Sequence, residues 1–247
     1  MFLVNLFTMS CTKKDEGSIT PTVPKDSVIA PLVVRKLDKS ALSDGSFTQY
    51  TYDTQGRCIR TDGRGTFTTF VYNSNTVVES DNYNNRVQST KIYTLNSKGL
   101  AISSTYVGSP LELTEYEYNS DDFLIRTTYK SKSGSSYSIA GEHNYTWDSD
   151  GDLLLETYRQ TNSYSEGNTR KKEIDKKHYN TTWNNEYTGQ KWRGKSSVHC
   201  IISDAYKPNN ATPITTKYTF IFDSKGYTTR WGSSNIYGDS YYDYTYK

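Results

Sequence analysis

The side chains that could do chemistry in this chain are three histidines, a run of aspartates and three cysteines. His143, His178 and His199 fall in three different expected strands, and none has a second ligand beside it at metal-binding spacing. A protein zinc site usually takes about three or four converging ligands. We therefore expect structural or exposed histidines and predict no metal.

The aspartate run Asp148-Ser149-Asp150-Gly151-Asp152 is similar to the start of a calcium loop, but it lacks the ligand order and the distal glutamate of an EF-hand. It also coincides with a predicted hairpin turn, so we expect a turn here. No phosphate-binding loop, nucleophile elbow or paired-carboxylate motif is present. The sequence therefore predicts no catalytic residue and no cofactor. Glycosidase carboxylates stay open, because folding and not spacing brings them together.

Charge argues against a nucleic-acid partner. The chain has 29 basic and 27 acidic side chains, for a net charge of +2. The densest basic stretch, 170–178, is interrupted by acids, which indicates a solvated strand face and not a phosphate site.

The N-terminus is typical of an exported protein. Residues 1–10 are uncharged, largely apolar and end in a small residue before Cys11, so we interpret them as a signal peptide. They are too few to span a bilayer, which takes ~20 residues. Thr8-Met9-Ser10-Cys11 resembles a bacterial lipobox, which implies that Cys11 is the lipid (palmitate) attachment site. The alternative is a cysteine that carries no lipid.

The segment after Cys11 predicts a tether. Residues 11–31 are polar and rich in Pro, Ser and Thr, so they bury too little apolar surface to fold. Lys14-Asp15-Glu16 resembles the signals that send Bacteroides-type lipoproteins to the cell surface. We expect one β-repeat domain at 32–247, anchored to the outer membrane on its periplasmic face or at the cell surface. Cys58 and Cys200 are expected to be free, partly buried thiols.

One sequence unit recurs along the domain: aromatic, any residue, aromatic, Asp or Asn, two polar residues and Gly. Tyrosine is unusually frequent, with 23 copies against 8 phenylalanines, as suits a half-exposed pleated sheet. The six copies occupy residues 50–56, 70–75, 93–99, 116–122, 145–151 and 220–226.

The unit predicts a β-hairpin. Its two aromatic positions share one strand face because strand side chains alternate. Asp or Asn opens a turn, and the Gly supplies the positive φ that closes it. Asn75 is expected to replace the Gly in the shorter second copy, and Asp122 to do so less comfortably.

Spacing predicts how the hairpins join. The turn openers at 53, 73, 96, 119, 148 and 223 leave room for a second turn within each early interval. The longest interval should hold longer strands near 171–179 and 198–205, with an irregular excursion through 184–189 between them. No helical periodicity is present. The fold class is therefore all-β: an antiparallel meander of some twelve to seventeen strands, forming one large twisted sheet or an open or closed barrel.

The unit Tyr52-Asp53-Thr54-Gln55-Gly56-Arg57, followed by Tyr72-Asn73, resembles the tyrosine-aspartate repeats of Rhs and teneurin-type shell proteins. More closely, it resembles the small Bacteroides-type lipoproteins of unknown function that carry degenerate copies behind a lipobox. The resemblance covers roughly 46–160 and 214–247. It implies the hairpin sheet and the anchored location, and it supplies no catalytic residue.

The leading hypothesis is a non-catalytic envelope lipoprotein that binds a glycan or a partner protein. The alternatives are a glycan-acting hydrolase, a purely structural envelope component and an outer-membrane β-barrel. Thr, Ser, Lys and Glu on the second strand face argue against the last. The aromatic rows are interpreted as the inward face, with sugar stacking as the alternative. Trp183 and Trp192 flank the excursion, where function often resides on loops.

Overall fold

The computed structural model describes residues 35–160, 168–180, 185, 188, 190–208 and 211–246. The expected signal peptide (1–10), Cys11 and the tether (11–31) lie outside the described residues. Within the described ranges, no helix is long and apolar enough to cross a membrane.

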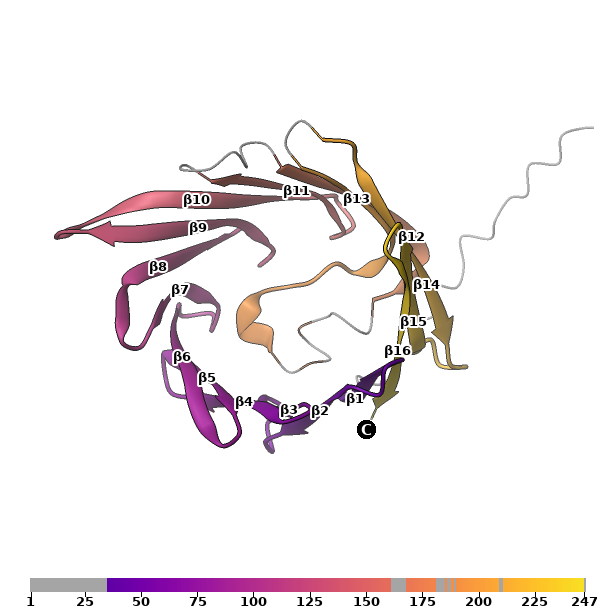
Figure 1. Cartoon of the computed structure of the whole chain (residues 1–247), viewed down its shortest axis with the longest axis horizontal. Coiled ribbons are helices and arrows are strands. Elements are labelled where there is room, and N and C mark those ends of the chain that lie inside the picture. Colours follow the sequence, from indigo (N-terminus) through magenta and orange to yellow (C-terminus); the bar gives the residue numbers. More distant parts are fainter. Residues whose placement is uncertain are drawn as a thin grey trace, which may run out of the picture.

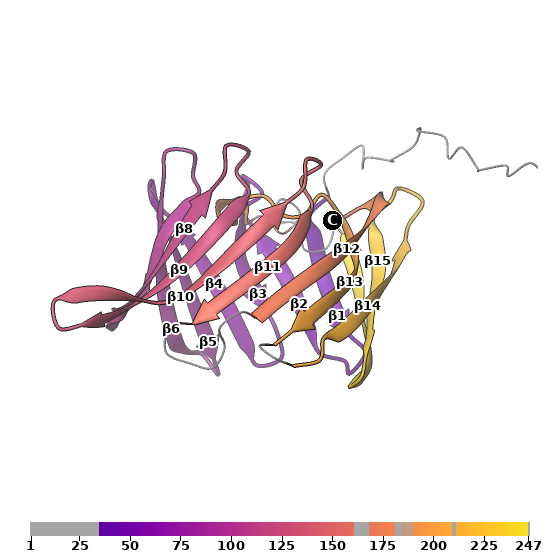
Figure 2. The same ribbon diagram turned by 90° about the horizontal axis from the view of Figure 1, so that it is seen from above.

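The chain forms a closed antiparallel barrel in which each strand pairs with its neighbours in sequence (Figure 1). This confirms the predicted all-β meander and selects the closed form. The strands run obliquely around the wall, and the β9–β10 hairpin projects beyond it (Figure 2). The sixteen strands are β1 Leu37–Leu42, β2 Phe47–Tyr52, β3 Cys58–Asp62, β4 Thr66–Tyr72, β5 Thr76–Tyr83, β6 Arg86–Leu95, β7 Ala101–Tyr106, β8 Ser109–Tyr118, β9 Leu124–Ser133, β10 Ser136–Trp147, β11 Leu153–Gln160, β12 Asn168–Tyr179, β13 His199–Lys207, β14 Ile214–Phe222, β15 Thr228–Asn235 and β16 Gly238–Tyr246.

The barrel closes where β1 meets β16. Ser40 is the register partner of Tyr244, so the last strand of the chain pairs with the first strand of the domain. Leu37 of β1 is 1% exposed and packs in one cluster with Tyr244 and Trp231. Closure therefore gives every described strand a hydrogen-bonded neighbour on both sides.

The repeated turns all lie at one end of the barrel, which we call the turn end. Asp53 opens the first: its side-chain Oδ1 accepts hydrogen bonds from the N–H groups of Gln55 and Arg57, and Gly56 has φ +72°. Asp122 takes the glycine position in the fourth copy with φ +69°, as predicted. The prediction for Asn75 is wrong. The second copy is one residue shorter and closes through the Asn73 N–H and the Thr76 carbonyl, without a positive φ at Asn75.

The paired rings face inward, as predicted. In β14 the exposed residues alternate with half-buried ones, so Tyr218, Phe220 and Phe222 lie on the opposite face from Thr219 and Ile221. Rings from many strands join two internal clusters, one around Trp192 and one around Trp231. The aromatic rows therefore supply the burial that this aliphatic-poor chain needs.

The excursion expected at 184–189 lies outside the described residues, apart from Asn185 and Thr188. The residues that follow, 190–198, lie inside the barrel; we call them the inner segment, and they contain the short 3-10 helix Lys191–Arg193. Figure 1 shows this segment inside the ring of strands. It forms a parallel bridge from Lys195 to Phe123, and the Val198 N–H donates to the Gly151 carbonyl. The inner segment therefore occupies the turn end of the barrel.

The expectation of a solvated face at 170–178 is wrong for Lys172, whose side chain is only 8% exposed. Arg170 also lines the lumen but stays 44% exposed. Lys171 and Glu173 take the opposite face, because strand side chains alternate.

Candidate ligand-binding lumen

The inner segment is fixed to the wall through a buried aromatic pair. The ring centroids of Trp192 and Tyr93 are 4.3 Å apart, and Trp192 is 5% exposed. The Tyr93 hydroxyl donates to Glu79 at 2.7 Å, and Arg193 pairs with the same carboxylate at 3.2 Å. These contacts join the segment to β5 and β6, so the segment is part of the core.

A buried carboxylate fixes the other end of the segment. Asp152 is fully buried and accepts hydrogen bonds from the His199 N–H at 2.7 Å, the His199 Nδ1 at 2.8 Å and the Ser197 Oγ at 3.1 Å. The Lys176 ammonium lies 2.6 Å from it. Burial alone would raise the pKa of the Asp152 carboxyl, but the hydrogen bonds from Lys176 and His199 outweigh it and hold this pKa below its ordinary value.

The aspartate run is thus a turn held by a lysine. The Lys176 Nζ also lies 2.6 Å from Asp148 and 3.0 Å from Asp150, so one ammonium occupies the centre of the three carboxylates. Among the described residues, no group of three or more His, Cys, Asp or Glu side chains could hold a metal ion.

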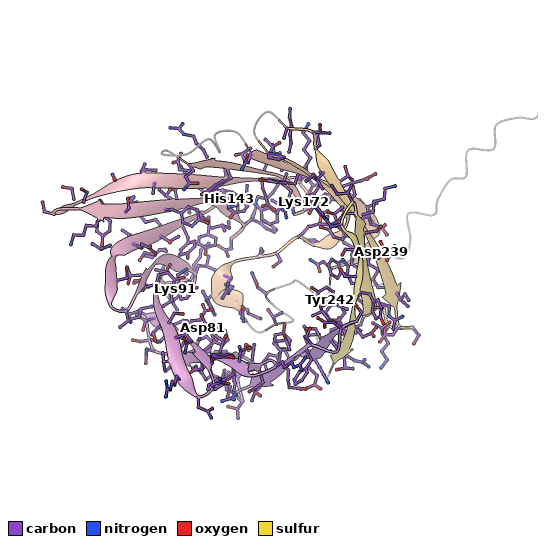
Figure 3. The ribbon with its side chains drawn as sticks, in the orientation of Figure 1. Asp81, Lys91, His143, Lys172, Asp239 and Tyr242 are labelled. Atoms are coloured by element: carbon purple, nitrogen blue, oxygen red, sulfur yellow. The ribbon has the colours of Figure 1, made fainter. Side chains whose placement is uncertain are left out.

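A pocket of about 480 Å³ opens in the lumen on the inner wall of β9–β13. It lies toward the end of the barrel opposite the inner segment, because Tyr158 pairs with Asn168 near the β11–β12 connection. The ring centroid of Tyr158 is 5.1 Å from that of His143 and 6.4 Å from that of Tyr129. The other lining residues include Glu156, Arg170 and Tyr206. Figure 3 shows His143 and Lys172 on the inner side of the wall.

Charges around this pocket cancel in pairs. Lys172 binds Glu156 at 2.8 Å, and Arg170 lies 3.6 Å from Asp204. Burial lowers the pKa of His143 more than the nearby Glu156 carboxylate raises it, which favours the uncharged ring. The pocket therefore offers ring faces and hydrogen-bonding groups without net charge.

The outer wall carries ion pairs between neighbouring strands as well as exposed apolar side chains such as Val71 and Ile221. Arg126 binds Glu117 at 2.8 Å, and Arg230 binds Asp243 at 2.6 Å. These residues face outward because their sequence neighbours, such as Tyr116 and Trp231, pack inside. Two further outward pairs are Glu115 with Lys130 and Arg60 with Asp62.

The structure places the residues that the sequence analysis singled out in different surroundings. Cys11 and Trp183 lie outside the described residues, and so does the side chain of His178. Cys58 and Cys200 form no disulfide, as expected, and both are fully rather than partly buried. Trp192 turns into the core and does not sit on a surface loop. Among the described residues lining the lumen pocket, Glu156 is the one carboxylate, so no catalytic pair converges there.

The sequence reasoning missed the pocket. Tyr129, Tyr158 and Tyr206 stand outside the repeated unit, so the search for that unit passed over them. Extending the inward period of two along each strand beyond the unit would have placed Tyr129 and Tyr158 on the lumen face.

Comparison with known proteins supports the fold. No family model and no curated protein matches the chain. A porin-like protein from Bacteroides uniformis is similar in structure, with a TM-score of 0.65 and 17% identity over 85% of this chain and 96% of that one. A porin-like protein from Bacteroides vulgatus has a TM-score of 0.63 and 15% identity over 86% of this chain and 99% of that one.

Proposed function

We propose that the chain is a non-catalytic outer-membrane lipoprotein whose barrel stands in water and binds a neutral glycan in its lumen. The observation that carries the proposal is the ring-lined pocket in which Glu156 and Arg170 are each neutralised by a partner. Tyrosine rings present an apolar face and a polar tip, as the faces and hydroxyls of a sugar require. A volume of about 480 Å³ lies in the range of small-molecule sites.

The recess favours a glycan over a folded partner protein. Tyr158, His143 and Glu156 lie inside the barrel, where a flat protein surface has no access. A sugar chain can enter the lumen end-on. The neutral pocket also disfavours an acidic sugar, because its carboxylate would compete with Glu156 and Asp204 for Lys172 and Arg170.

The outer wall favours water over lipid around the barrel. A lipid-facing barrel needs an apolar band, and an Arg or Lys at the bilayer midplane costs roughly 2–4 kcal/mol. Arg126 and Arg230 would meet that cost here, whereas in water their ion pairs with Glu117 and Asp243 are ordinary surface contacts. Rings of the repeated unit, such as Tyr50 and Tyr52, pack inside, whereas Tyr241 is exposed on the outer wall.

The proposed anchor sets the orientation. The described chain begins at Arg35, whose N–H donates to the Tyr227 hydroxyl just after a repeated turn, so the chain enters at the turn end. Lipid on Cys11 would leave 35 − 11 = 24 residues of tether. A flexible tether of that length spans roughly 25–30 Å. The turn end would then face the membrane, and the pocket would open away from it.

The repeated hairpins support a kinship with the degenerate tyrosine-aspartate repeat lipoproteins. Five of the six copies keep a turn in which the Asp or Asn side chain accepts backbone N–H groups, and the second copy closes by a shorter turn. Every copy except the third, which has Leu95, has rings at both strand positions. The sixteen strands close around one lumen. We therefore propose that these repeats build a small binding barrel here and not a shell.

The test uses the full chain with Cys11→Ser, so that no lipid is attached. Maltohexaose, cellohexaose, xylohexaose and chitohexaose are titrated by calorimetry. We expect at least one to bind, and Tyr158→Ala to weaken it about tenfold, the loss of ~1.4 kcal/mol. Tyr241→Ala is the matched control, because this tyrosine lies on the outer wall at 42% exposure. Failure of all four to bind, or equal loss in both variants, would refute the glycan proposal.

The second candidate is a membrane-spanning pore, which the structural likeness to porin-like proteins favours. Planar-bilayer conductance tests it. The water-exposed barrel proposed here predicts no conductance steps, and reproducible steps from the unlipidated chain would favour the pore.

A further inference from the structure

A second pocket lies at the turn end, between the inner segment and the turns that follow β6 and β8. We call it the turn-end pocket; its volume is about 400 Å³, in the range of small-molecule sites. The turn after β6 contributes Leu100, the turn after β8 contributes Phe123, and the inner segment contributes Val198. These three apolar side chains come from separate parts of the chain, so only the folded barrel brings them together.

The apolar side of the turn-end pocket is held in place by packing. Leu100 is 7% exposed and Phe123 is 9% exposed. The ring centroids of Phe123 and Trp147 are 4.7 Å apart. Phe123 and Val198 both pack against Gly151, because a Cβ there would lie 2.6 Å from the Phe123 Cζ and 3.0 Å from the Val198 Cγ2. Neighbours on the barrel side therefore fix the apolar floor of the pocket.

The charged side of the pocket has one pair that cancels and one cation that does not. Lys98 binds Asp122 at 2.7 Å, which joins the two turns. The Lys195 ammonium lies 5.4 Å from the Phe123 ring centroid, and within the described part of the chain no carboxylate pairs with it. The Lys195 N–H donates to the Asp122 carbonyl, so its backbone is fixed beside the pocket. Lys191 also lines the pocket but interacts with another residue, so its charge is not counted.

We propose that the turn-end pocket binds a small amphiphile with one carboxylate, such as a medium-chain fatty acid. The apolar floor covers the chain of the ligand, because burial of apolar surface is favourable. The Lys195 ammonium binds the carboxylate through a charge-assisted hydrogen bond. Asp122 lies on the same rim, so its carboxylate disfavours a head group with two or more negative charges.

This pocket differs from the lumen pocket in the ligand that it suits. The lumen pocket is lined by three tyrosines and its charges cancel in pairs. Among the described residues of the turn-end pocket, none is a tyrosine, asparagine or glutamine. It therefore offers little to the hydroxyl groups of a sugar. The proposal goes beyond glycan binding and does not depend on it.

The test uses the full chain with Cys11→Ser, so that no attached acyl chain competes for the pocket. Octanoate, hexanoate, acetate and 1-octanol are titrated by calorimetry in low-salt buffer. We expect octanoate to bind more tightly than 1-octanol, and this preference to shrink with added salt. Hexanoate should bind up to about fourfold more weakly for each methylene lost, the equivalent of ~0.8 kcal/mol per methylene. Acetate should not bind detectably.

Variants of Lys195 test the charge. Lys195→Gln should weaken octanoate binding about threefold, as expected for one exposed ion pair. Lys195→Glu should weaken it about tenfold, because repulsion replaces the attraction. Neither should change 1-octanol binding, and this exposed position poses little risk to folding. Val198→Thr keeps the branched shape but adds a hydroxyl to the floor, so it should weaken octanoate and 1-octanol alike.

The matched control is Lys225→Glu. Lys225 is exposed at the same end of the barrel, in the turn after β14, and lies outside the pocket. The substitution makes the same change in net charge without touching the site. It should change octanoate affinity less than twofold.

The proposal is overturned if octanoate does not bind, if 1-octanol binds as tightly as octanoate, or if Lys225→Glu weakens binding as much as Lys195→Glu. The hexasaccharide titrations keep this result separate from the lumen site. Lys195→Glu should bind hexasaccharides as the unsubstituted chain does, because no described residue lines both pockets. Loss of both ligands in Lys195→Glu would show a general structural effect and would also overturn the assignment to this pocket.

Discussion

The indole ring of Trp192 and the phenol ring of Tyr93 meet at a centroid distance of 4.3 Å inside the barrel, although the residues come from the inner segment and from β6. Trp192→Ala should therefore lower the free energy of unfolding by roughly 3–5 kcal/mol, through lost burial and the cavity left behind. Urea denaturation measures it. Val71→Ala, on the outer wall at 56% exposure, should cost less than about 0.5 kcal/mol. Similar losses in the two variants would contradict a packed inner segment.

Asp152→Asn should destabilise the barrel by about 1–3 kcal/mol at pH 7, because it removes a fully buried charge that Lys176 and His199 bind. Asp150→Asn is the control. Asp150 binds the same ammonium, but its side chain is 60% exposed, so its loss should be within about 1 kcal/mol.

The same carboxylate predicts a pH dependence. The pKa of Asp152 is lower folded than unfolded. Its contribution is therefore complete above the ordinary pKa of ~3.9 and is lost as the pH falls through the lowered value. The difference in unfolding free energy between the wild type and Asp152→Asn should shrink as the pH falls below about 4. A difference that stays constant over that range would show that the charge does not stabilise the fold.

His143 predicts a separate window at higher pH. Burial lowers its pKa in the folded chain, so the unfolded chain takes up a proton first as the pH falls. Its contribution to stability is present above its ordinary pKa of ~6.5 and is lost below it. The free energy of unfolding, measured at pH 7.5 and at pH 5, should fall less between these two pH values for His143→Gln than for the wild type. An equal fall in the two proteins would contradict the burial of the His143 imidazole.

Alanine substitutions at two turn glycines distinguish backbone strain from steric clash of the added Cβ atom. Gly151 and Gly45 have nearly equal φ angles, +85° and +82°, so alanine costs about 1–2 kcal/mol of backbone strain at either. At Gly151 a new Cβ would also lie 2.6 Å from the Phe123 ring, whereas at Gly45 it meets nothing within 4 Å. Gly151→Ala should therefore cost about 1–3 kcal/mol more than Gly45→Ala. Equal losses in thermal unfolding would mean that the ring moves aside freely.

The features of the fold that depend on a few neighbouring residues could be predicted from the sequence. The inward face of Tyr50 and Tyr52 and the turn from Asp53 to Gly56 follow from alternation and turn chemistry within a few residues, and both are confirmed. Asn75 was mispredicted because the missing residue changed the turn type, which outweighed the tolerance of asparagine for positive φ.

Long-range features could not be predicted in this way. Pairing of β1 with β16 depends on the number of strands and on their tilt. No single residue indicates either quantity. The inward turn of Arg170 and Lys172 depends on Asp204 and Glu156 across the wall, so charge alone favoured a solvated face. The lumen pocket is likewise assembled from five strands.

The central claim is that the outer wall faces water while the rings face the lumen. Thr219 lies exposed on the outer face of β14, between the inward Tyr218 and Phe220. The unlipidated chain with Thr219→Cys is labelled with an environment-sensitive dye and mixed with vesicles made from outer-membrane lipids. The claim predicts emission typical of water, unchanged by the vesicles. A blue shift to the emission of a hydrocarbon environment would contradict it and place the wall in the bilayer.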